Sequence, residues 1–359
     1  MQKQLRITGL GVPHNEGKPI LIAGPCSAEG EEQVLETAAQ LSRIGCKIFR
    51  AGVWKPRTKP GGFEGYGEKA LVWLKAVKEQ SNMLVATEVA TPKHVELALS
   101  YGVDILWVGA RTSSSPFAMQ ELAGALRGVD VPVLVKNPVC PDLGLWIGAM
   151  ERLSQSGVTK IAAVHRGFPL YGEQIYRNAP IWQIPIELRR CIPNLPIFID
   201  PSHMGGQRDL VQSLCQQAME LCYDGLMIES HCSPDDALTD AAQQVSPMSL
   251  GHILSELNIR NNKIKDDELS EYRAQINEAD ERIVKMLANR MGVCRKVAKY
   301  KSEHDMSVLQ AKRYDELLRK WEEWADVYGL SYDFTQRLFG LIHEESVNEQ
   351  MKILNTNNK

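Results

Sequence analysis

The chain has 359 residues, of which 44% are hydrophobic and 24% are charged, and its formal net charge is -3 at pH 7. This length exceeds one average domain and fits a barrel of about 250 residues followed by a smaller unit. The net charge argues against nucleic acid or an anionic membrane as a partner, no apolar run approaches the roughly 20 residues of a membrane span, and the N-terminal sequence lacks the apolar segment of a signal peptide, so we expect a cytoplasmic protein.

Short apolar runs between Pro19 and His231 predict eight β-strands, each bounded by Gly, Pro or polar residues. The predicted strands are 20–23, 47–50, 84–89, 105–109, 132–135, 160–164, 197–199 and 226–228. Stretches such as 31–45, with apolar residues three and four apart, predict helices between them. This alternation predicts an α/β fold, a (β/α)₈ TIM barrel over residues 1–257. The alternative, an open doubly wound sheet, normally carries a Gly-rich dinucleotide fingerprint near its start, which is lacking here.

Positively charged side chains follow several predicted strands. They are Arg50, Lys55 and Arg57 within KIFRAGVWKPRTK at 47–59, and then Arg111, Lys136 and Arg166. A run of like charge standing alone is as often a solvated face, but these six cations leave four strand ends. They predict a pocket for a small, multiply anionic substrate, because Arg matches phosphate and carboxylate oxygens bidentately and Lys adds a mobile charge.

Metal-ligand residue types follow the first, seventh and eighth predicted strands. The candidate ligands are Cys26 in AGPCSAE, His203 in DPSH, and Glu229 and Asp240 in IESHCSPDDALTD, with His231 and Asp235 as alternates to the last two. In a closed barrel the last strand pairs with the first, so these segments are neighbours. Each residue taken alone is more often a buried thiol or a loop histidine. Together, a thiol, an imidazole and carboxylates predict a site for a divalent transition metal, Mn, Fe, Co or Zn, rather than Mg or Ca.

The pattern changes after the barrel, with a polar linker at 258–267 and an all-α three-helix domain at 268–359. A long first helix carries an apolar stripe from Leu269 to Val297. Arg290 and Lys301 are 11 positions apart, which places them within about 20° of one face and roughly 16 Å apart, so both could hold one small dianion. Arg273, about 26 Å before Arg290 on another face, would have to act in a partner chain. Solvated charges on an amphipathic helix are the alternative interpretation.

The motifs GPCS, FRAGVWKPRT, VGAR, KNP, HRGF, DPSH and IESH followed by ALTD occur in this order. Over residues 1–257 the chain therefore resembles 3-deoxy-arabino-heptulosonate 7-phosphate (DAHP) synthase, and its short N-terminus resembles the type Iβ form. The related 3-deoxy-octulosonate 8-phosphate synthases carry an Asn-containing sequence in place of KPRT. The C-terminal helices resemble the all-helical chorismate mutases. The matching positions are Arg273, Arg290, Lys301, Arg313, Ser346 and Gln350, while Gln310 and Tyr314 stand where acidic residues are common.

The first resemblance implies metal-dependent condensation of phosphoenolpyruvate with erythrose 4-phosphate. It assigns Arg50, Lys55, Arg111, Lys136 and Arg166 to phosphoenolpyruvate, and Lys55, Pro56, Arg57 and Thr58 to erythrose 4-phosphate. Lys55 is also a candidate proton donor or relay. A barrel that works without metal is the rival reading.

The second resemblance implies rearrangement of chorismate to prephenate, with Arg290, Lys301 and Gln350 as catalytic residues. It implies a homodimer, or a higher oligomer, built through the long helix. The fusion further predicts feedback inhibition of the barrel by prephenate. In the alternative, the helical domain is a non-catalytic regulatory and dimerisation module.

Overall fold

The computed structural model describes residues 5–13, 17–55, 61–172, 175–260 and 267–357. The chain forms two compact units, Met1–Asn261 and Asn262–Lys359, and each is described by itself. Among the described residues, no helix is long and apolar enough to cross a membrane.

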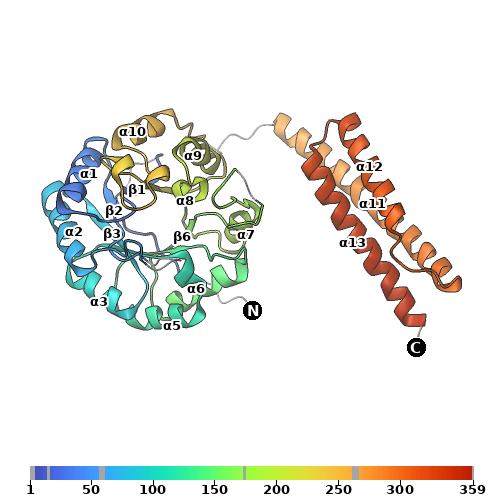
Figure 1. The fold of residues 1–359 in the computed structure, drawn as a ribbon, viewed down its shortest axis with the longest axis horizontal. Coiled ribbons are helices and arrows are strands. Elements are labelled where there is room, and N and C mark those ends of the chain that lie inside the picture. The colour runs from blue at the N-terminus through green and yellow to red at the C-terminus, as the bar shows by residue number, and fades with distance from the viewer. Residues whose placement is uncertain (1–4, 14–16, 56–60, 173–174, 261–266, 358–359) are drawn as a thin grey trace. The chain divides into compact units, whose positions relative to one another are not determined.

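The first unit is a closed parallel barrel in the order β1 to β8, so the predicted (β/α)₈ fold is confirmed (Figure 1). The strands are β1 (Ile20–Gly24), β2 (Ile48–Arg50), β3 (Leu84–Val89), β4 (Ile105–Val108), β5 (Val133–Lys136), β6 (Ile161–His165), β7 (Ile197–Ile199) and β8 (Gly225–Glu229). β8 closes on β1 with Gly24 opposite Glu229. This register places the exits of the first and last strands side by side.

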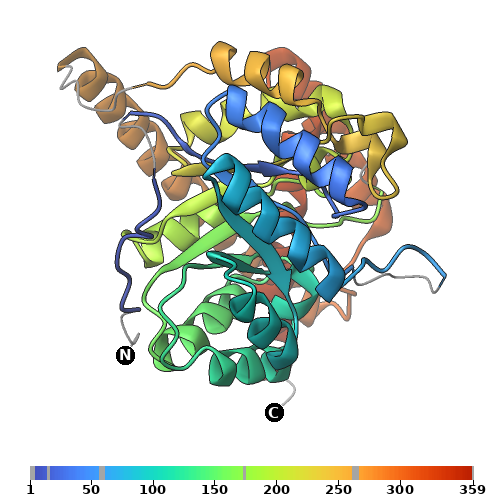
Figure 2. The same ribbon diagram turned by 90° about the vertical axis from the view of Figure 1, so that its left-hand side faces the viewer.

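Helices surround the strands. They are α1 (Glu31–Arg43), α2 (Glu68–Ser81), α3 (Pro92–Ser100), α4 (Ala110–Ser113), α5 (Pro116–Ala125), α6 (Leu143–Gln155), α7 (Gln183–Cys191), α8 (Pro201–Gly205), α9 (Val211–Glu220) and α10 (Pro247–Glu256), with short 3₁₀ turns η1 (Arg208–Leu210), η2 (Pro234–Asp236) and η3 (Ala241–Gln243). α1 packs beside α2, and α10 runs along α1 (Figure 2). Side-chain oxygens of Thr91, Ser115 and Asp142 cap α3, α5 and α6, so local sequence fixes where these helices begin.

Two apolar layers hold the barrel. Side chains such as Ile22, Trp107 and Phe198 fill its interior, while a larger cluster lies between strands and helices. This filled interior leaves the strand ends as the place for a site. At the exit of β1, Gly24 has φ +151, and a Cβ there would lie 2.0 Å from the Arg50 carbonyl oxygen. Glycine at this position therefore lets the β1 and β2 exits approach closely.

The second unit consists of three helices, α11 (Asp267–Glu303), α12 (Ala311–Tyr328) and α13 (Tyr332–Asn357), in which α13 packs against both others. Within its described part, the buried side chains are Ala298, Lys301, Ala325, Thr335, Phe339, Ile342, Ser346 and Gln350. The residues of α11 from 269 to 286 are all exposed. A unit with so small a core buries little of its apolar surface alone.

Candidate active sites

A cavity of about 890 Å³ lies at the carboxyl ends of the barrel strands. Its walls include one residue from or after each of the eight strands, namely Cys26, Lys55, Glu88, Arg111, Lys136, Arg166, His203 and Asp240. The structure thus brings together four of the six cations predicted for an anionic substrate. Pro56, Arg57 and Thr58, predicted for the same pocket, lie outside the described residues.

Arg50 lies behind the cavity and is 1% exposed. Its guanidinium carbon sits 4.7 Å from the centre of the Trp107 ring, and Nη2 lies 3.3 Å from Glu229 Oε1. Its Nε and Nη1 have no hydrogen-bond partner among the described residues. Buried donors are normally paired, so two unpaired nitrogens on one guanidinium indicate a place for an anionic ligand.

Lys136 and Arg166 are held by neighbouring acceptors. Lys136 Nζ donates to Asp200 Oδ2 at 2.6 Å, and Arg166 Nη1 donates to Asn178 Oδ1 at 2.8 Å. Burial lowers the pKa of Arg166 to about 10, which leaves the guanidinium charged at neutral pH. Both cations are therefore positioned before any ligand arrives.

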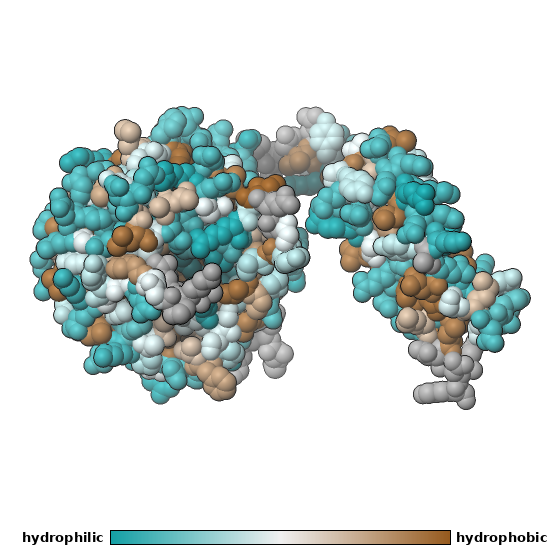
Figure 3. Space-filling view, in the orientation of Figure 1, coloured by the Kyte–Doolittle hydropathy of each residue, from teal (hydrophilic) through white to brown (hydrophobic). Residues whose placement is uncertain are grey.

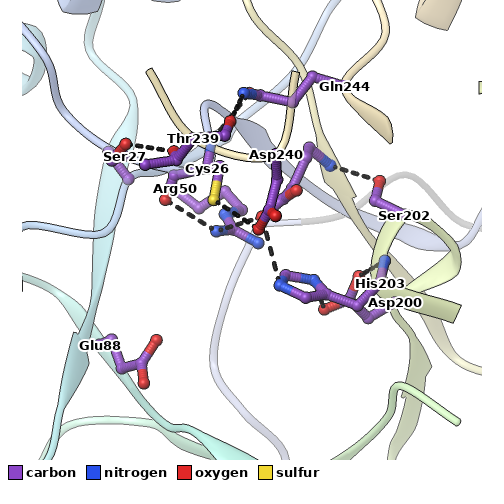
Figure 4. Close-up of polar contacts among 12 residues, drawn as sticks. Cys26, Ser27, Arg50, Glu88, Asp200, Ser202, His203, Thr239, Asp240 and Gln244 are labelled. Atoms are coloured by element: carbon purple, nitrogen blue, oxygen red, sulfur yellow. Dashed lines mark hydrogen bonds and ion pairs between the residues drawn. The ribbon is translucent and has the colours of Figure 1, made fainter. Parts of the chain in front are cut away.

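The predicted metal ligands converge beside this cavity (Figure 4). Ligand atoms of Cys26, Glu229 and Asp240 all lie within 4.8 Å of one another, and Cys26 Sγ is 3.4 Å from Asp240 Oδ2. His203 Nε2 lies 3.6 Å from Glu229 Oε1, and its Nδ1 lies 2.8 Å from Asp200 Oδ2. An imidazole with one nitrogen toward a carboxylate and the other toward a ligand cluster is the usual arrangement of a metal-binding histidine. The donor set fits a divalent transition ion.

The electrostatics of this cluster differ between its thiol and its carboxylate. Burial raises the pKa of the Cys26 thiol to about 12, an effect that a bound cation would oppose because metal coordination deprotonates a thiol. Burial alone would raise the pKa of Asp240, but His203 and Arg177 outweigh it and hold the value at about 2. Asp240 is therefore ionised and ready to accept a cation.

The alternates His231 and Asp235 face elsewhere. His231 Nε2 lies 3.8 Å from Glu29 Oε2, and Asp235 pairs with Arg208 at 2.6 Å on the surface. Neither belongs to the group formed by Cys26, Glu229 and Asp240.

Sequence reasoning missed two residues around the site, Arg177 and Asn178, and gave no role to a third, Asp200. Arg177 Nη1 donates to Asp240 Oδ1 at 3.0 Å and to Gln243 Oε1 at 2.7 Å, and Asn178 holds Arg166. Both lie within the long loop between β6 and α7, well beyond the predicted strand end, so no local pattern marks them. Asp200 contacts Lys136 and His203, and its place in DPSH right after a strand was a usable signal.

The helical unit gathers some of its predicted residues. Arg290 on α11 donates to the Ser346 hydroxyl on α13, and Gln350 lies one helical turn beyond Ser346. Gln350 is 8% exposed, and its Oε1 has no hydrogen-bond partner among the described residues. Lys301 is 7% exposed, and its Nζ donates to the Val308 carbonyl at 2.6 Å. Buried polar groups in so small a core are costly, which indicates a ligand site.

Other predicted residues of this unit stand apart. Arg273 is exposed on the N-terminal half of α11, and Arg313 pairs with Glu316 at 3.0 Å on the surface. Tyr314 packs edge-on against His343, with ring centres 4.7 Å apart. One chain alone therefore does not bring the six predicted positions together.

Two family models match the chain. Residues 6–265 match the DAHP synthetase I family, and residues 272–351 match chorismate mutase type II. A phospho-2-dehydro-3-deoxyheptonate aldolase from Thermotoga maritima is 36% identical over 225 residues, which are 63% of this chain and 64% of that protein. A 2-dehydro-3-deoxyphosphooctonate aldolase from Desulfotalea psychrophila is 28% identical over 262 residues, covering 67% of this chain and 89% of that protein.

Solved structures agree with this placement. The crystal structure of the Thermotoga maritima phospho-2-dehydro-3-deoxyheptonate aldolase (DAHP synthase) superposes with a TM-score of 0.62 at 32% identity, covering 70% of this chain and 72% of that chain. A truncated form of the Thermotoga maritima synthase gives 0.60 at 30% identity, with 70% and 90% covered. Because the first family model spans well over half of the sequence, the chain belongs to the DAHP synthetase I family, here fused to a C-terminal type II chorismate mutase domain.

Proposed function

We propose that the barrel condenses phosphoenolpyruvate with erythrose 4-phosphate to give DAHP and phosphate, and that the helical unit rearranges chorismate to prephenate. The observation that carries the first activity is the cavity in which cations face the Cys26 cluster. Two phosphorylated substrates need such a field of positive charge, and an aldehyde acceptor needs an electrophilic partner. Membership of the family supplies the identity of the reaction.

In this proposal Arg50, Lys55, Arg111, Lys136 and Arg166 bind phosphoenolpyruvate. The unpaired Nε and Nη1 of Arg50 would donate to phosphate or carboxylate oxygens, and Arg166 is already fixed by Asn178. Pre-positioned donors favour charge that develops in the transition state, because no reorganisation is needed during the reaction. We assign erythrose 4-phosphate to Lys55, Pro56, Arg57 and Thr58.

Lys55 lies between the cavity and the Cys26 cluster. Its Nζ donates to Cys26 Sγ at 3.2 Å, and the side chain also lines the cavity. This placement supports a role in donating or relaying a proton to the aldehyde oxygen. A Lys55→Met variant that lost substrate affinity but kept its single-turnover rate would contradict the proton role.

Cys26, His203, Glu229 and Asp240 would hold a divalent transition ion, Mn, Fe, Co or Zn. When bound, the ion would supply a Lewis acid for the aldehyde oxygen. Asp200 orients His203 through Nδ1, and Arg177 holds one oxygen of Asp240. These outer contacts would keep the four ligands in place before loading.

For the helical unit, the rearrangement needs neither cofactor nor covalent catalysis, only charges fixed around a transition state that separates charge. We assign Lys301 and Gln350 to the ether oxygen, and Arg290, Arg313 and Ser346 to the rest of the bound chorismate. The open Oε1 of buried Gln350 and the burial of Lys301 support this assignment. Arg273 would enter from a partner chain.

We expect a homodimer through α11, or a higher oligomer containing it. Leu269, Tyr272, Ile276 and Ile283 of the predicted stripe are each more than 40% exposed, and apolar side chains mark the surface of this unit (Figure 3). Large apolar side chains exposed at helical spacing are typical of a subunit interface. A twofold interface would also bring Arg273 of each chain to its partner.

The helical unit would also sense product. Prephenate bound there is expected to inhibit the barrel, and linkage requires barrel ligands to alter affinity at the mutase site in return. The alternative is a helical unit that binds and dimerises without catalysing, and Tyr314 in place of an acidic residue favours it.

Steady-state assays on the full chain test both proposals. Loss of phosphoenolpyruvate with erythrose 4-phosphate, and loss of chorismate, would each be followed with and without prephenate. We expect both activities, with the first inhibited by prephenate. Condensation without mutase activity would support the non-catalytic alternative, and unchanged condensation at saturating prephenate would contradict feedback.

A further inference from the structure

Glu29, three residues after Cys26 and just ahead of α1, holds the loop that carries Asp240. Its side chain is 7% exposed. Oε1 accepts from Ser27 Oγ at 2.8 Å and from Thr239 Oγ1 at 3.3 Å, and Oε2 accepts from the Leu238 N–H at 2.9 Å. One carboxylate therefore joins the segment after β1 to the segment after β8.

Gln244 makes a second link between the same two segments. Its Oε1 accepts from the Cys26 N–H at 2.9 Å, and its Nε2 donates to the Thr239 carbonyl at 2.8 Å. The hydroxyls of Ser27 and Thr239 also contact each other, as Figure 4 shows. Cys26 and Asp240 are each adjacent in sequence to one member of this hydroxyl pair, so the links act directly on both ligand positions.

Glu29 lies beside a histidine. Among the described residues, its ion-pair neighbour is His231, whose Nε2 lies 3.8 Å from Oε2. His231 Nδ1 accepts from the Ser233 N–H at 2.9 Å, so the proton of the neutral ring sits on Nε2, toward Glu29. The carboxylate thus faces donors on every described contact. An ionised carboxylate, which only accepts, suits this position better than an amide, which must present N–H groups at one end.

We propose that Glu29 is a positioning residue for the metal site, one that fixes Cys26 and Asp240 at ligand spacing by tying Ser27 to Leu238 and Thr239. The inference rests on the proposed metal-dependent function. Outer contacts of this kind set metal affinity, because unsupported ligands lose conformational entropy on binding.

Binding of Mn²⁺ to the full chain tests this, followed by the electron paramagnetic resonance signal of the free ion. We expect Glu29→Ala to raise the Kd by roughly 10- to 100-fold and Glu29→Gln to raise it less, because the two hydroxyls can rotate to accept from the amide. Glu31→Ala, an exposed acidic residue two positions later, is the matched control and should bind as the wild type does.

Co²⁺ gives a second readout. In the Co²⁺-loaded wild type, a thiolate-to-metal absorption band reports ligation by Cys26, and we expect Glu29→Ala to weaken this band at equal occupancy. A purely structural role for Glu29 would change thermal stability but leave the band and the Kd of the folded protein unchanged, which would overturn the inference.

Two further outcomes are decisive. Should Glu29→Ala fail to fold, Thr239→Val, which removes one donor at constant shape, is expected to raise the Kd a few-fold, and an unchanged Kd would contradict the inference. A wild type that bound no Mn²⁺ or Co²⁺ would overturn the proposed metal site itself and the inference with it. That result is distinct from equal binding by the wild type and Glu29→Ala, which refutes only the role of Glu29.

Discussion

The barrel and the helical unit assemble their candidate sites in opposite ways. In the barrel, a residue from or after every strand lines one cavity, and the candidate metal ligands lie close together within one chain. In the helical unit, Arg290 and Ser346 meet, while Arg273 and Arg313 remain exposed and apart.

The difference follows from how each unit closes. A barrel has no free edge, so Gly24 and Glu229 are adjacent although 205 positions separate them, and distant motifs must converge. Three helices have open faces, and α11 is roughly 55 Å long, so charges along it stay far apart unless a second chain covers them. The comparison predicts a barrel site that is complete in each chain and a mutase site that two chains share.

Removing the thiol of Cys26, a proposed metal ligand, should give the largest difference between the activities of the two units. We expect Cys26→Ala to lower condensation at least about 10³-fold, because a Lewis acid is worth several kcal/mol, and to leave chorismate turnover unchanged. A chelator should act likewise on the wild type. Cys222→Ser, at the opposite end of β8, is the control. Full condensation activity after chelation and in Cys26→Ala would support a barrel that works without metal.

Arg273 tests whether the mutase site is shared. Arg273→Ala and Arg290→Ala should each lower kcat/KM for chorismate by roughly 10²- to 10³-fold, because each removes one charge-stabilising donor. When the two variants are mixed, unfolded and refolded together, about a quarter of the chorismate sites should be intact. Half of the dimers then contain one chain of each variant, and each of these mixed dimers has one intact site. Condensation should be unaffected throughout. No recovery on mixing would place Arg273 in its own chain's site or outside it.

The barrel was largely predictable because its information is local. Each strand is a short apolar run with charged or ligand residues after it, and closure then brings Cys26 and Glu229 together, while Asp240 reaches them through the loop after β8. Strand bounds differ from prediction by one residue at most places, as in Val133–Lys136 against 132–135. Such shifts arise because hydrogen bonding to the neighbouring strand, rather than hydropathy, decides where a β-strand ends.

The parts that escaped prediction depend on tertiary structure. Arg177 reaches Asp240 only because the loop after β6 folds back over the cavity, and Glu29 gains its role from a loop 209 residues away. His231 and Glu229 are equally good ligands by residue type. Only the direction of each side chain, Glu229 inward and His231 toward Glu29, separates them.

The barrel should also respond to acid through a group outside the site. His165 is fully buried among Trp146, Phe168, Trp182 and Tyr223, and burial lowers its pKa to about 3. The unfolded state, with a pKa near 6.5, binds more protons below that pH, so stability is complete above about pH 6.5 and falls as the pH drops toward 3. At pH 5 the loss is about 2 kcal/mol.

Thermal unfolding of the full chain at pH 7.5 and pH 5 measures this effect. We expect the barrel transition to move to lower temperature at pH 5 and His165→Gln to lose most of that pH dependence. The transition of the helical unit serves as the internal reference. If the unfolding temperature of His165→Gln fell between pH 7.5 and pH 5 as much as that of the wild type, the acid sensitivity would belong to other groups.

The smallest expected effect concerns Tyr314 in the helical unit. Its ring packs against His343 and Phe339, where the mutase resemblance has an acidic residue that hydrogen-bonds the substrate. Tyr314→Glu should therefore raise kcat/KM for chorismate by about fivefold, the value of one net hydrogen bond of about 1 kcal/mol. Tyr314→Gln, which is uncharged but of similar length, separates charge from shape. A loss of activity in both variants would mean that Tyr314 supports the site through packing. A low mutase activity would then be due to the need for a second chain, and not to the replacement of an acidic residue by Tyr314.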